Sequence, residues 1–497
     1  MHFSCISHYF RKGIMNKPST IYLENCLSHC NIANSIAYLF EGSLNISLFN
    51  QSVQEVLSRV QKFQYELIPL SNTESEWREH ARRVPPVKVI DTDNFEKSFG
   101  EFTAGIFNYC REYDYFPLFF TIFRDYVNTE PAGENTGSSK ESEIIEGSFH
   151  IVETLNHTYC DGRSCEFLFN EIIACYNALL ENDSKTVEKI KTMVSAVSTP
   201  ASDDIYAFDN KESLIKMKKW QHIKNIFKLA TAKLNDRGAF SVKYDVIEKE
   251  WENFRKLKHY PEMHRFDLTP LIEFYEANNK QISNNSLITA LLVKAFYYVN
   301  SVIHNNPENR IITFRMMSDI LSARQRQQFI GNYCAYVPVI TDGSRSLEEI
   351  CLDINRQVEN FRKMKADVSM YKFLEYALRK GLAGKKDDPT SFTVSLVLHR
   401  KLIKHPEYLK GCHFIETTGG LNYEPLDLFG AKMNNKVGPT LALSNNNILF
   451  ITYYPLIGGN QILDKVTIAF NRILKDEIAG ITGKQAGVSD NINGKAA

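Results

Sequence analysis

A histidine in one short stretch of the sequence has the neighbours expected around a catalytic base. Residues 153–164 read ETLNHTYCDGRS, so His157 stands four residues before Asp161 and five before Gly162. A neutral imidazole can take a proton from a hydroxyl, an amine or a thiol near pH 7, because its reference pKa is close to that pH. The pattern predicts general-base chemistry at His157. The structural alternative is a histidine in an ordinary turn whose Asp-Gly pair starts a helix.

Two predicted elements can hold this histidine in one orientation. Residues 147–156 alternate apolar and other side chains as a strand does, and residues 163–180 repeat apolar side chains at helical spacing. Gly162 can adopt backbone angles that other residues resist. Asp161 can orient the imidazole, cap the following helix or pair with an arginine from elsewhere in the chain. The sequence leaves these three roles of Asp161 open.

Cys160 and Cys165 offer a second chemistry beside the histidine. A thiol acts as a nucleophile only when a neighbouring group activates it, and His157 is close in sequence. A thiol enzyme would place one of these two sulfurs within hydrogen-bond reach of His157. The ten cysteines of the chain are scattered, which is typical of reduced thiols in a cytoplasmic protein. We therefore expect a cytoplasmic location.

The N-terminal region carries no recognised signal. In CLSHC the spacing of Cys26, His29 and Cys30 is compatible with metal ligation, but no second pair of ligands follows, so we expect no metal site. Residues 1–13 lack the sustained apolar core and the cleavage site of a secretory signal. Met15 is an alternative start, because the residues before it fit no known pattern.

Composition favours a globular protein of two domains. The chain has 497 residues, of which 43% are hydrophobic and 23% charged, and two domains of roughly 200 residues each suit this length. Lysine and arginine number 58, as do aspartate and glutamate, so the net charge is zero. This balance argues against nucleic acid or an anionic membrane as the main partner, although it leaves room for a local basic patch. The apolar residues 287–303 include Lys294 and Asn300, which predicts a buried helix and no membrane-spanning segment.

Periodicity along the chain predicts a mixed α/β protein of the α+β sandwich type. Predicted strands cover residues 32–42, 115–123, 147–156, 310–317, 329–340, 391–398, 441–444 and 448–454. Predicted helices cover residues 44–60, 95–110, 163–180, 286–303, 347–366 and 463–474. Pro117 makes the strand at 115–123 an edge strand or a broken one. The predicted divisions are an unassigned segment 1–19, a first half 20–181, a mostly helical crossover 182–258, a similar second half 259–476 and a flexible tail 477–497.

The layout of these elements resembles the coenzyme A-dependent acyltransferase superfamily. This group includes chloramphenicol acetyltransferase, the condensation domains of nonribosomal peptide synthetases, alcohol acetyltransferases, wax ester synthases and plant acyltransferases with an HxxxDG motif. The motif at His157 lies between a strand and a helix in a chain of fitting length. Four further segments look like family segments, namely NSIAYLFEGSLNISLFNQSVQEVLSRV, SNNSLITALLVKAF, SDILSARQRQQFIGNYCAYVPV and ILFITYYPLIGGNQ. The resemblance covers about residues 20 to 475.

The resemblance implies two similar halves with a tunnel between them and His157 midway along it. His157 would be the general base for transfer of an acyl group from acyl-CoA, or from the pantetheine arm of a carrier protein, to a hydroxyl or amine of a small acceptor. No permanently bound cofactor is implied. Asp161 and Gly162 would be structural, with Asp161 paired to an arginine. We predict Arg324 as that arginine, with Arg315 second. A buried pair of this kind costs heavily to break on one side only.

Two departures keep other readings open. Asn156 stands where many condensation domains have a first histidine, and no Asp-Phe-Gly-Trp-Gly stretch is present, so the plant branch is not indicated. A catalytically silent relative that binds a partner or carrier protein is the alternative. An oxyanion donor is expected to face His157, since negative charge develops in the tetrahedral intermediate. Thr440, Ser444 and Asn445 are candidates, although a simple hairpin turn is the better explanation for each.

Overall fold

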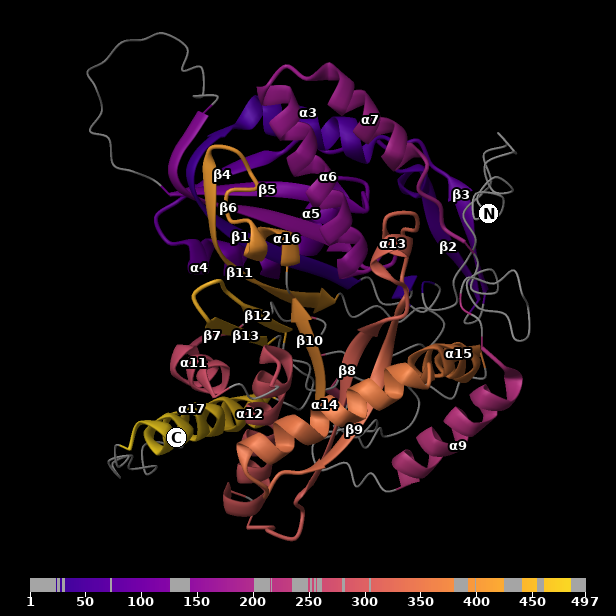
Figure 1. Cartoon of the computed structure of the whole chain (residues 1–497). Coiled ribbons are helices and arrows are strands. Elements are labelled where there is room, and N and C mark those ends of the chain that lie inside the picture. The colour runs from indigo at the N-terminus through magenta and orange to yellow at the C-terminus, as the bar shows by residue number, and fades with distance from the viewer. Residues whose placement is uncertain are drawn as a thin grey trace.

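The computed structural model describes most of the chain. The described residues are 32–71, 74–125, 144–200, 217–234, 262–278, 282–303, 305–379, 392–397, 399–423, 440–453 and 460–483, with a few short pieces between them, among which is Glu24. Two mixed units of helix and sheet make up these residues (Figure 1). The predicted mixed α/β class is therefore confirmed.

The first sheet contains five strands in the order β11-β1-β6-β5-β4. These strands are β1 (Ile32–Asn45), β4 (Lys88–Thr92), β5 (Leu118–Asp125), β6 (Ile144–Asn156) and β11 (Cys412–Tyr423). The long central strand β1 pairs antiparallel with both β6 and β11. Because β11 comes from the last quarter of the chain, the sheet draws on both predicted halves, an exchange that the sequence did not indicate.

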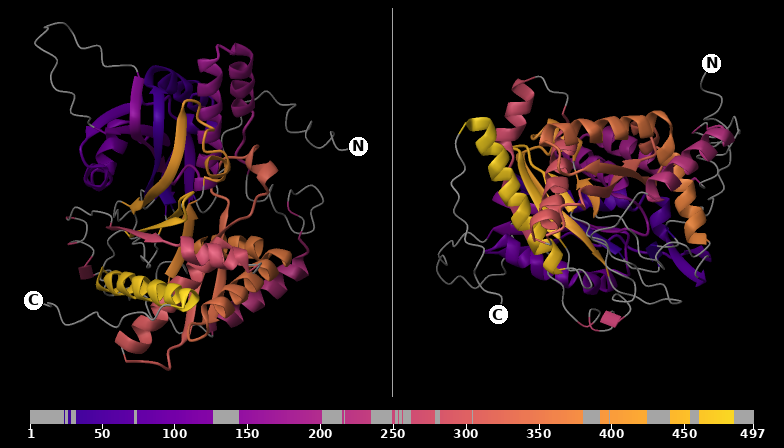
Figure 2. Two further views of the ribbon diagram at one scale, coloured as in Figure 1. Left: turned by 60° about the vertical axis from the view of Figure 1, so that its left-hand side comes forward. Right: turned by 90° about the horizontal axis from the view of Figure 1, so that it is seen from below.

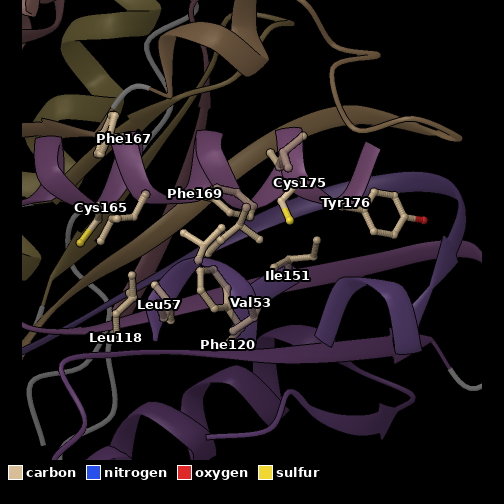
Figure 3. Packing of buried hydrophobic residues seen from close by; sticks show 14 of the residues in the cluster. Val53, Leu57, Leu118, Phe120, Ile151, Cys165, Phe167, Phe169, Cys175 and Tyr176 are labelled. Carbon is tan, nitrogen blue, oxygen red and sulfur yellow. The ribbon is translucent and has the colours of Figure 1, made fainter. Parts of the chain in front are cut away.

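Helices cover both faces of this sheet. They are α3 (Ile46–Leu57), α6 (Gly162–Leu180) and α7 (Ser184–Ser195) on one face, and α4 (Phe95–Ala104) and α5 (Ile106–Glu112) on the other. Figure 3 shows side chains of α6 packing toward Val53 and Leu57 of α3 and Phe120 of β5. Burying this apolar surface is the main force that holds α6, and with it the preceding loop, against the sheet.

The second sheet contains six strands in the order β7-β13-β12-β10-β8-β9. These are β7 (Glu262–Asp267), β8 (Ile311–Asp319), β9 (Cys334–Asp342), β10 (Phe392–Val397), β12 (Thr440–Leu443) and β13 (Ile448–Tyr453). Four helices pack their apolar side chains against it, namely α11 (Thr269–Ala277), α12 (Asn284–Tyr298), α14 (Leu347–Lys363) and α17 (Asn460–Thr482). Figure 2 shows α17, in yellow, lying across one side of this sheet.

The remaining elements are smaller or peripheral. They are the 3-10 turn η1 (Gln61–Gln64), the hairpin β2 (Tyr65–Ser71) and β3 (Glu74–Glu79), α9 (Lys219–Leu234), the π-helical segment η2 (Val299–Ile303), α13 (Ala323–Arg326), α15 (Ala366–Arg379) and α16 (Arg400–Lys404). Together α12 and η2 are long and apolar enough to cross a membrane, but about two thirds of their most apolar window is buried inside the protein. The prediction of a buried helix there is confirmed.

Several predicted boundaries need correction. The predicted helix 95–110 is two helices separated at Gly105. The strand predicted at 115–123 begins only after Pro117, and β5 then lies between β4 and β6, so it is neither an edge strand nor broken. The flexible tail predicted from residue 477 is wrong for its first residues, because α17 continues to Thr482. The apolar side chains of Ile478 and Ile481 pack against the hydrophobic core of the second sheet, and this packing extends the helix.

Candidate functional site

His157 lies directly after the last residue of β6, and its backbone is held from two sides. Its amide donates to the carbonyl of Ile32 on β1 at 2.7 Å. Its own carbonyl accepts a hydrogen bond from the side-chain amide of Asn332 at 3.0 Å. Asn332 lies just before β9, so the second half of the chain contacts the motif directly. The loop is therefore fixed by a rigid strand end and by a side chain from the opposite unit.

The imidazole of His157 is partly buried, and its surroundings favour the neutral form. The Nδ1 atom is buried and has no hydrogen-bond partner among the described residues. Burial lowers the pKa of His157, while its own backbone carbonyl, the charge of Asp161 and the Asn332 side chain act in the opposite direction with smaller effect. A histidine that stays neutral near pH 7 keeps a lone pair available to accept a proton.

Asp161 performs two of its three predicted roles. It is the N-cap of α6, where its Oδ1 accepts from the backbone amide of Ser164 at 3.0 Å. It also forms a two-point ion pair with Arg326, at 3.0 Å from Nη1 to Oδ1 and 2.8 Å from Nη2 to Oδ2. The amide of Tyr333 donates to Oδ2 at 3.0 Å. These donors offset burial and hold the pKa of Asp161 below its usual value.

Arg326, and neither Arg324 nor Arg315, is the arginine that pairs with Asp161. Its guanidinium also donates to Asp319, from Nε at 2.8 Å and from Nη2 at 2.7 Å, so it bridges two carboxylates. The prediction of Arg324 is wrong: that side chain is exposed. Two residues along a helix correspond to a rotation of about 200°, so α13 turns Arg326 inward and Arg324 outward. Arg315 lies on β8 with its guanidinium 5.5 Å from the centre of the Tyr336 ring.

Gly162 does not need the conformational freedom expected of it. Its backbone lies outside the left-handed region, and a Cβ added there would meet no heavy atom within 4 Å. It is the first residue of α6 and is exposed. Gly331, across the interface, has the tighter environment, since an added Cβ would lie 2.9 Å from the Tyr333 ring. The Tyr333 ring, two residues further along the same segment, therefore leaves room only for glycine at 331.

The two cysteines of the motif do not meet the condition for a thiol enzyme. The sulfurs of Cys160 and Cys165 lie 3.8 Å from each other in the first core, and no hydrogen bond joins either to His157 within the described structure. Burial, with Cys160 and Glu153 nearby, raises the pKa of Cys165 well above its usual value. Figure 3 shows Cys165 among the apolar side chains of this core. A buried thiol of raised pKa is a poor nucleophile, so the thiol reading is not supported.

A second buried ion pair contacts the backbone of Asn332. The ammonium of Lys62 lies 2.5 Å from Oε1 of Glu24, and both side chains are buried. The same Oε1 accepts from the backbone amide of Asn332 at 3.3 Å. Sequence reasoning missed Glu24, Lys62 and the role of Asn332. The one available signal is the Gly-Asn pair before β9, which belongs to one of the segments that resemble the family.

The candidates for an oxyanion donor stay predictions. The hydroxyl of Ser444 accepts from the amide of Ile448 at 3.0 Å, which closes the hairpin between β12 and β13. Thr440 pairs with Thr452 across that hairpin. Both side-chain polar atoms of Asn445 are buried and lack a partner among the described residues. Within the described residues, no hydrogen bond links any of the three candidates to His157.

The cluster Cys26, His29 and Cys30 lies outside the described residues. In the part of the chain that the structure describes, no group of three or more His, Cys, Asp or Glu side chains is placed to hold a metal ion.

Comparison with known proteins identifies the fold. No protein-family model and no curated protein matches the sequence. Among solved structures, TRI3 trichothecene 15-O-acetyltransferase from Fusarium sporotrichioides is similar, with a TM-score of 0.61, 10% identity, and coverage of 92% of this chain and 94% of that one. The chain has the fold of the coenzyme A-dependent acyltransferase superfamily.

Condensation domains of this superfamily are similar as well. The starter condensation domain of rhizomide synthetase RzmA, solved with C8-CoA and Leu-SNAC, gives a TM-score of 0.54 at 9% identity and covers 92% of this chain and 91% of that chain. The first condensation domain of the calcium-dependent antibiotic synthetase was solved in complex with a substrate analogue. It gives a TM-score of 0.53 at 10% identity and covers 93% of this chain and 96% of that chain. The fold predicted from the resemblance is confirmed. The tunnel between the halves stays a prediction.

Proposed function

We propose that this protein is an acyltransferase that moves an acyl group from a thioester to a hydroxyl or amine. The observation that carries the proposal is the partly buried His157, held at a strand end by Ile32 and by Asn332 of the opposite unit. Burial lowers the pKa of His157, which favours the neutral form. An acyltransferase fold supports it, and one similar domain was solved with C8-CoA.

The chemistry follows from the two ring nitrogens of His157. Because Nδ1 is buried, Nε2 is the nitrogen proposed to face the acceptor. The imidazole takes the proton of the acceptor O–H or N–H as the acceptor attacks the thioester carbonyl. When the tetrahedral intermediate collapses, the C–S bond breaks and the imidazolium returns the proton to the leaving thiolate. A positioned base of this kind typically contributes about 10²- to 10⁴-fold to the rate.

The roles of Asp161 and Arg326 in this proposal are structural. Both oxygens of the Asp161 carboxylate accept hydrogen bonds, from Arg326, Ser164 and Tyr333, so the carboxylate is not free to bind substrate. Through this ion pair the motif loop and α13 are held at one spacing. The acyl donor is proposed to be acyl-CoA or an acylated carrier protein, and the site of action is proposed to be the cytoplasm.

The test is thioester turnover with a matched control. The purified protein is incubated with acetyl- and long-chain acyl-CoA and a panel of alcohols and amines, and free thiol is measured. We expect acceptor-dependent release that falls at least about 100-fold in His157→Ala. His413→Ala, an exposed histidine on β11, should leave the rate unchanged. Release that persists in His157→Ala would contradict the general-base role.

The alternative function is a catalytically silent protein that binds a carrier or another partner. Asn156 motivates it, since its side chain accepts from the Thr158 amide at 3.1 Å and so has a structural use in place of a catalytic one. If no acyl-CoA is consumed, the assay is repeated with acylated carrier proteins. Turnover there identifies the donor, whereas tight binding without turnover supports the silent alternative.

A further inference from the structure

The helix α9 has an unusual distribution of side chains, because three of its large apolar residues face outward. Trp220, Ile223 and Phe227 are 65%, 47% and 71% exposed. Their spacing of three and four residues places them on one face of the helix. Apolar stripes on helices normally face a core, so an exposed stripe indicates a surface that is covered by something else.

Polar side chains attach the opposite face of α9 to the protein. Asn225 is buried, and its side-chain amide donates to the carbonyl of Met364 at 3.0 Å and to the hydroxyl of Ser369 at 3.0 Å. Gln221 donates to the same carbonyl at 2.8 Å. The orientation of the helix is therefore set by specific hydrogen bonds to the junction of α14 and α15, and its apolar stripe is held outward. Figure 1 shows α9 at the periphery of the molecule beside α15.

The charge along this segment of the chain is of one sign. Residues 213–235 contain six lysines and no aspartate or glutamate, within a chain whose net charge is zero. Lys219 and Lys224 are exposed, and the ammonium of Lys224 lies 5.5 Å from the centre of the Trp220 ring. Lysines beside an apolar stripe can extend to a negative surface while their alkyl chains cover apolar groups.

We propose that α9 docks the protein on an anionic lipid surface. Trp220, Ile223 and Phe227 would enter the boundary between headgroups and acyl chains, and the flanking lysines would contact lipid phosphates. A bilayer surface of this composition offers both a negative layer and an apolar layer beneath it, which matches a narrow apolar stripe bordered by positive charge. This docking is peripheral, and it leaves the helices of the protein core in place.

Vesicle flotation of the full chain tests the proposal. With vesicles of phosphatidylcholine containing 30% phosphatidylserine we expect at least about tenfold more bound protein than with phosphatidylcholine alone, falling as salt is added. Phe227→Glu should reduce binding about tenfold, and the double variant Lys219→Glu/Lys224→Glu should remove the preference for phosphatidylserine. Ile468→Glu is the matched control, because Ile468 is 62% exposed on α17, away from the lysine run. Equal binding by Phe227→Glu and Ile468→Glu would overturn the proposal.

Tryptophan fluorescence gives a second readout that does not depend on a disruptive variant. The chain has three tryptophans, and Trp77 is fully buried. In a Trp251→Phe variant, a blue shift on adding anionic vesicles and quenching by brominated lipid would therefore report Trp220. No spectral change, or binding to a soluble acyl carrier protein in place of vesicles, would overturn the lipid assignment. Turnover of water-soluble substrates should stay unchanged in the α9 variants, so failure of this inference is distinct from failure of the proposed function.

Discussion

The side-chain amide of Asn332 donates to the backbone carbonyl of His157 at 3.0 Å, across a separation of 175 residues. It also lies 3.3 Å from the carbonyl of Thr158. One side chain from the second half of the chain therefore holds two consecutive carbonyls of the motif loop. Since the imidazole is attached to this loop, Asn332 is a positioning residue for His157.

Replacing Asn332 should slow the reaction more than it weakens substrate binding. Asn332→Ala removes the donor to the His157 carbonyl, and we expect kcat to fall about 10- to 100-fold with KM changed little, since a small displacement of a base is costly. In the wild type, the contact with Asn332 raises the pKa of His157. Losing this contact should lower that pKa and move the acid limb of the pH–rate profile to lower pH. Steady-state kinetics from pH 5 to 8 measure both effects.

A buried asparagine elsewhere is the control for Asn332. Asn225→Ala removes two comparable hydrogen bonds, from α9 to Met364 and Ser369, far from the motif in sequence. It should lower stability by about 1–2 kcal/mol per lost bond and leave kcat intact. Equal losses of kcat in the two variants would show that Asn332 acts only through global stability.

Breaking the Asp161–Arg326 pair should destabilise the protein strongly. Arg326→Leu leaves the carboxylate of Asp161 buried without its partner, and we expect the free energy of unfolding to fall by about 3–5 kcal/mol. Arg324→Leu, two residues away and exposed, should change it by less than about 0.5 kcal/mol. Urea denaturation measures the difference. Similar effects of the two substitutions would mean that Arg326 does not carry the pair.

Acid should destabilise the protein through its buried neutral histidines. Burial lowers the pKa of His399 to about 3, well below its unfolded value near 6.5. Between these values the unfolded state binds the extra proton, so His399 contributes stability that is complete above pH 6.5 and is lost as the pH falls toward 3. In His399→Asn, which keeps an acceptor for the Leu402 amide, this loss is absent.

The advantage of wild type over His399→Asn should therefore shrink by about 2 kcal/mol between pH 6.5 and 5, at about 1.4 kcal/mol per pH unit. Urea midpoints at several pH values measure it. Parallel curves for wild type and His399→Asn would contradict a neutral His399 in the folded state.

Glu153 should act with the opposite sign. Burial raises its pKa to about 7, although Cys165 and Tyr38 oppose the shift by hydrogen bonding. The folded state then holds a proton that the unfolded state has released above pH 4.5, so the stability from Glu153 is complete below pH 4.5 and is lost as the pH rises to 7.

Glu153→Gln removes this titration and keeps an oxygen for the Tyr38 hydroxyl, which donates to the carboxyl at 3.1 Å. Relative to wild type, we expect the variant to gain about 3 kcal/mol of unfolding free energy as the pH rises from 4.5 to 7. Calorimetry or urea denaturation across this range provides the measurement. A constant difference between the two proteins would show that Glu153 is ionised in the folded state at pH 5.

The sequence by itself determined the local framework of the site. Alternation of apolar residues was enough to predict the strand that ends at Asn156, and helical spacing was enough for the helix that follows. The position of Asp161 just before that helix made it a natural N-cap, and the structure confirms this role. These features depend on neighbours within a few residues, which is the range over which backbone geometry fixes which side chains face the same way.

Only the tertiary structure decided what reaches this framework from far along the chain. Arg326 was not separable from Arg324 by sequence, because which side of a four-residue helix is buried depends on how α13 packs against α6. The role of Asn332 and the addition of β11 to the first sheet likewise depend on contacts across more than 170 residues. Such contacts are set by the joint packing of two units, and no local periodicity in either segment encodes its partner.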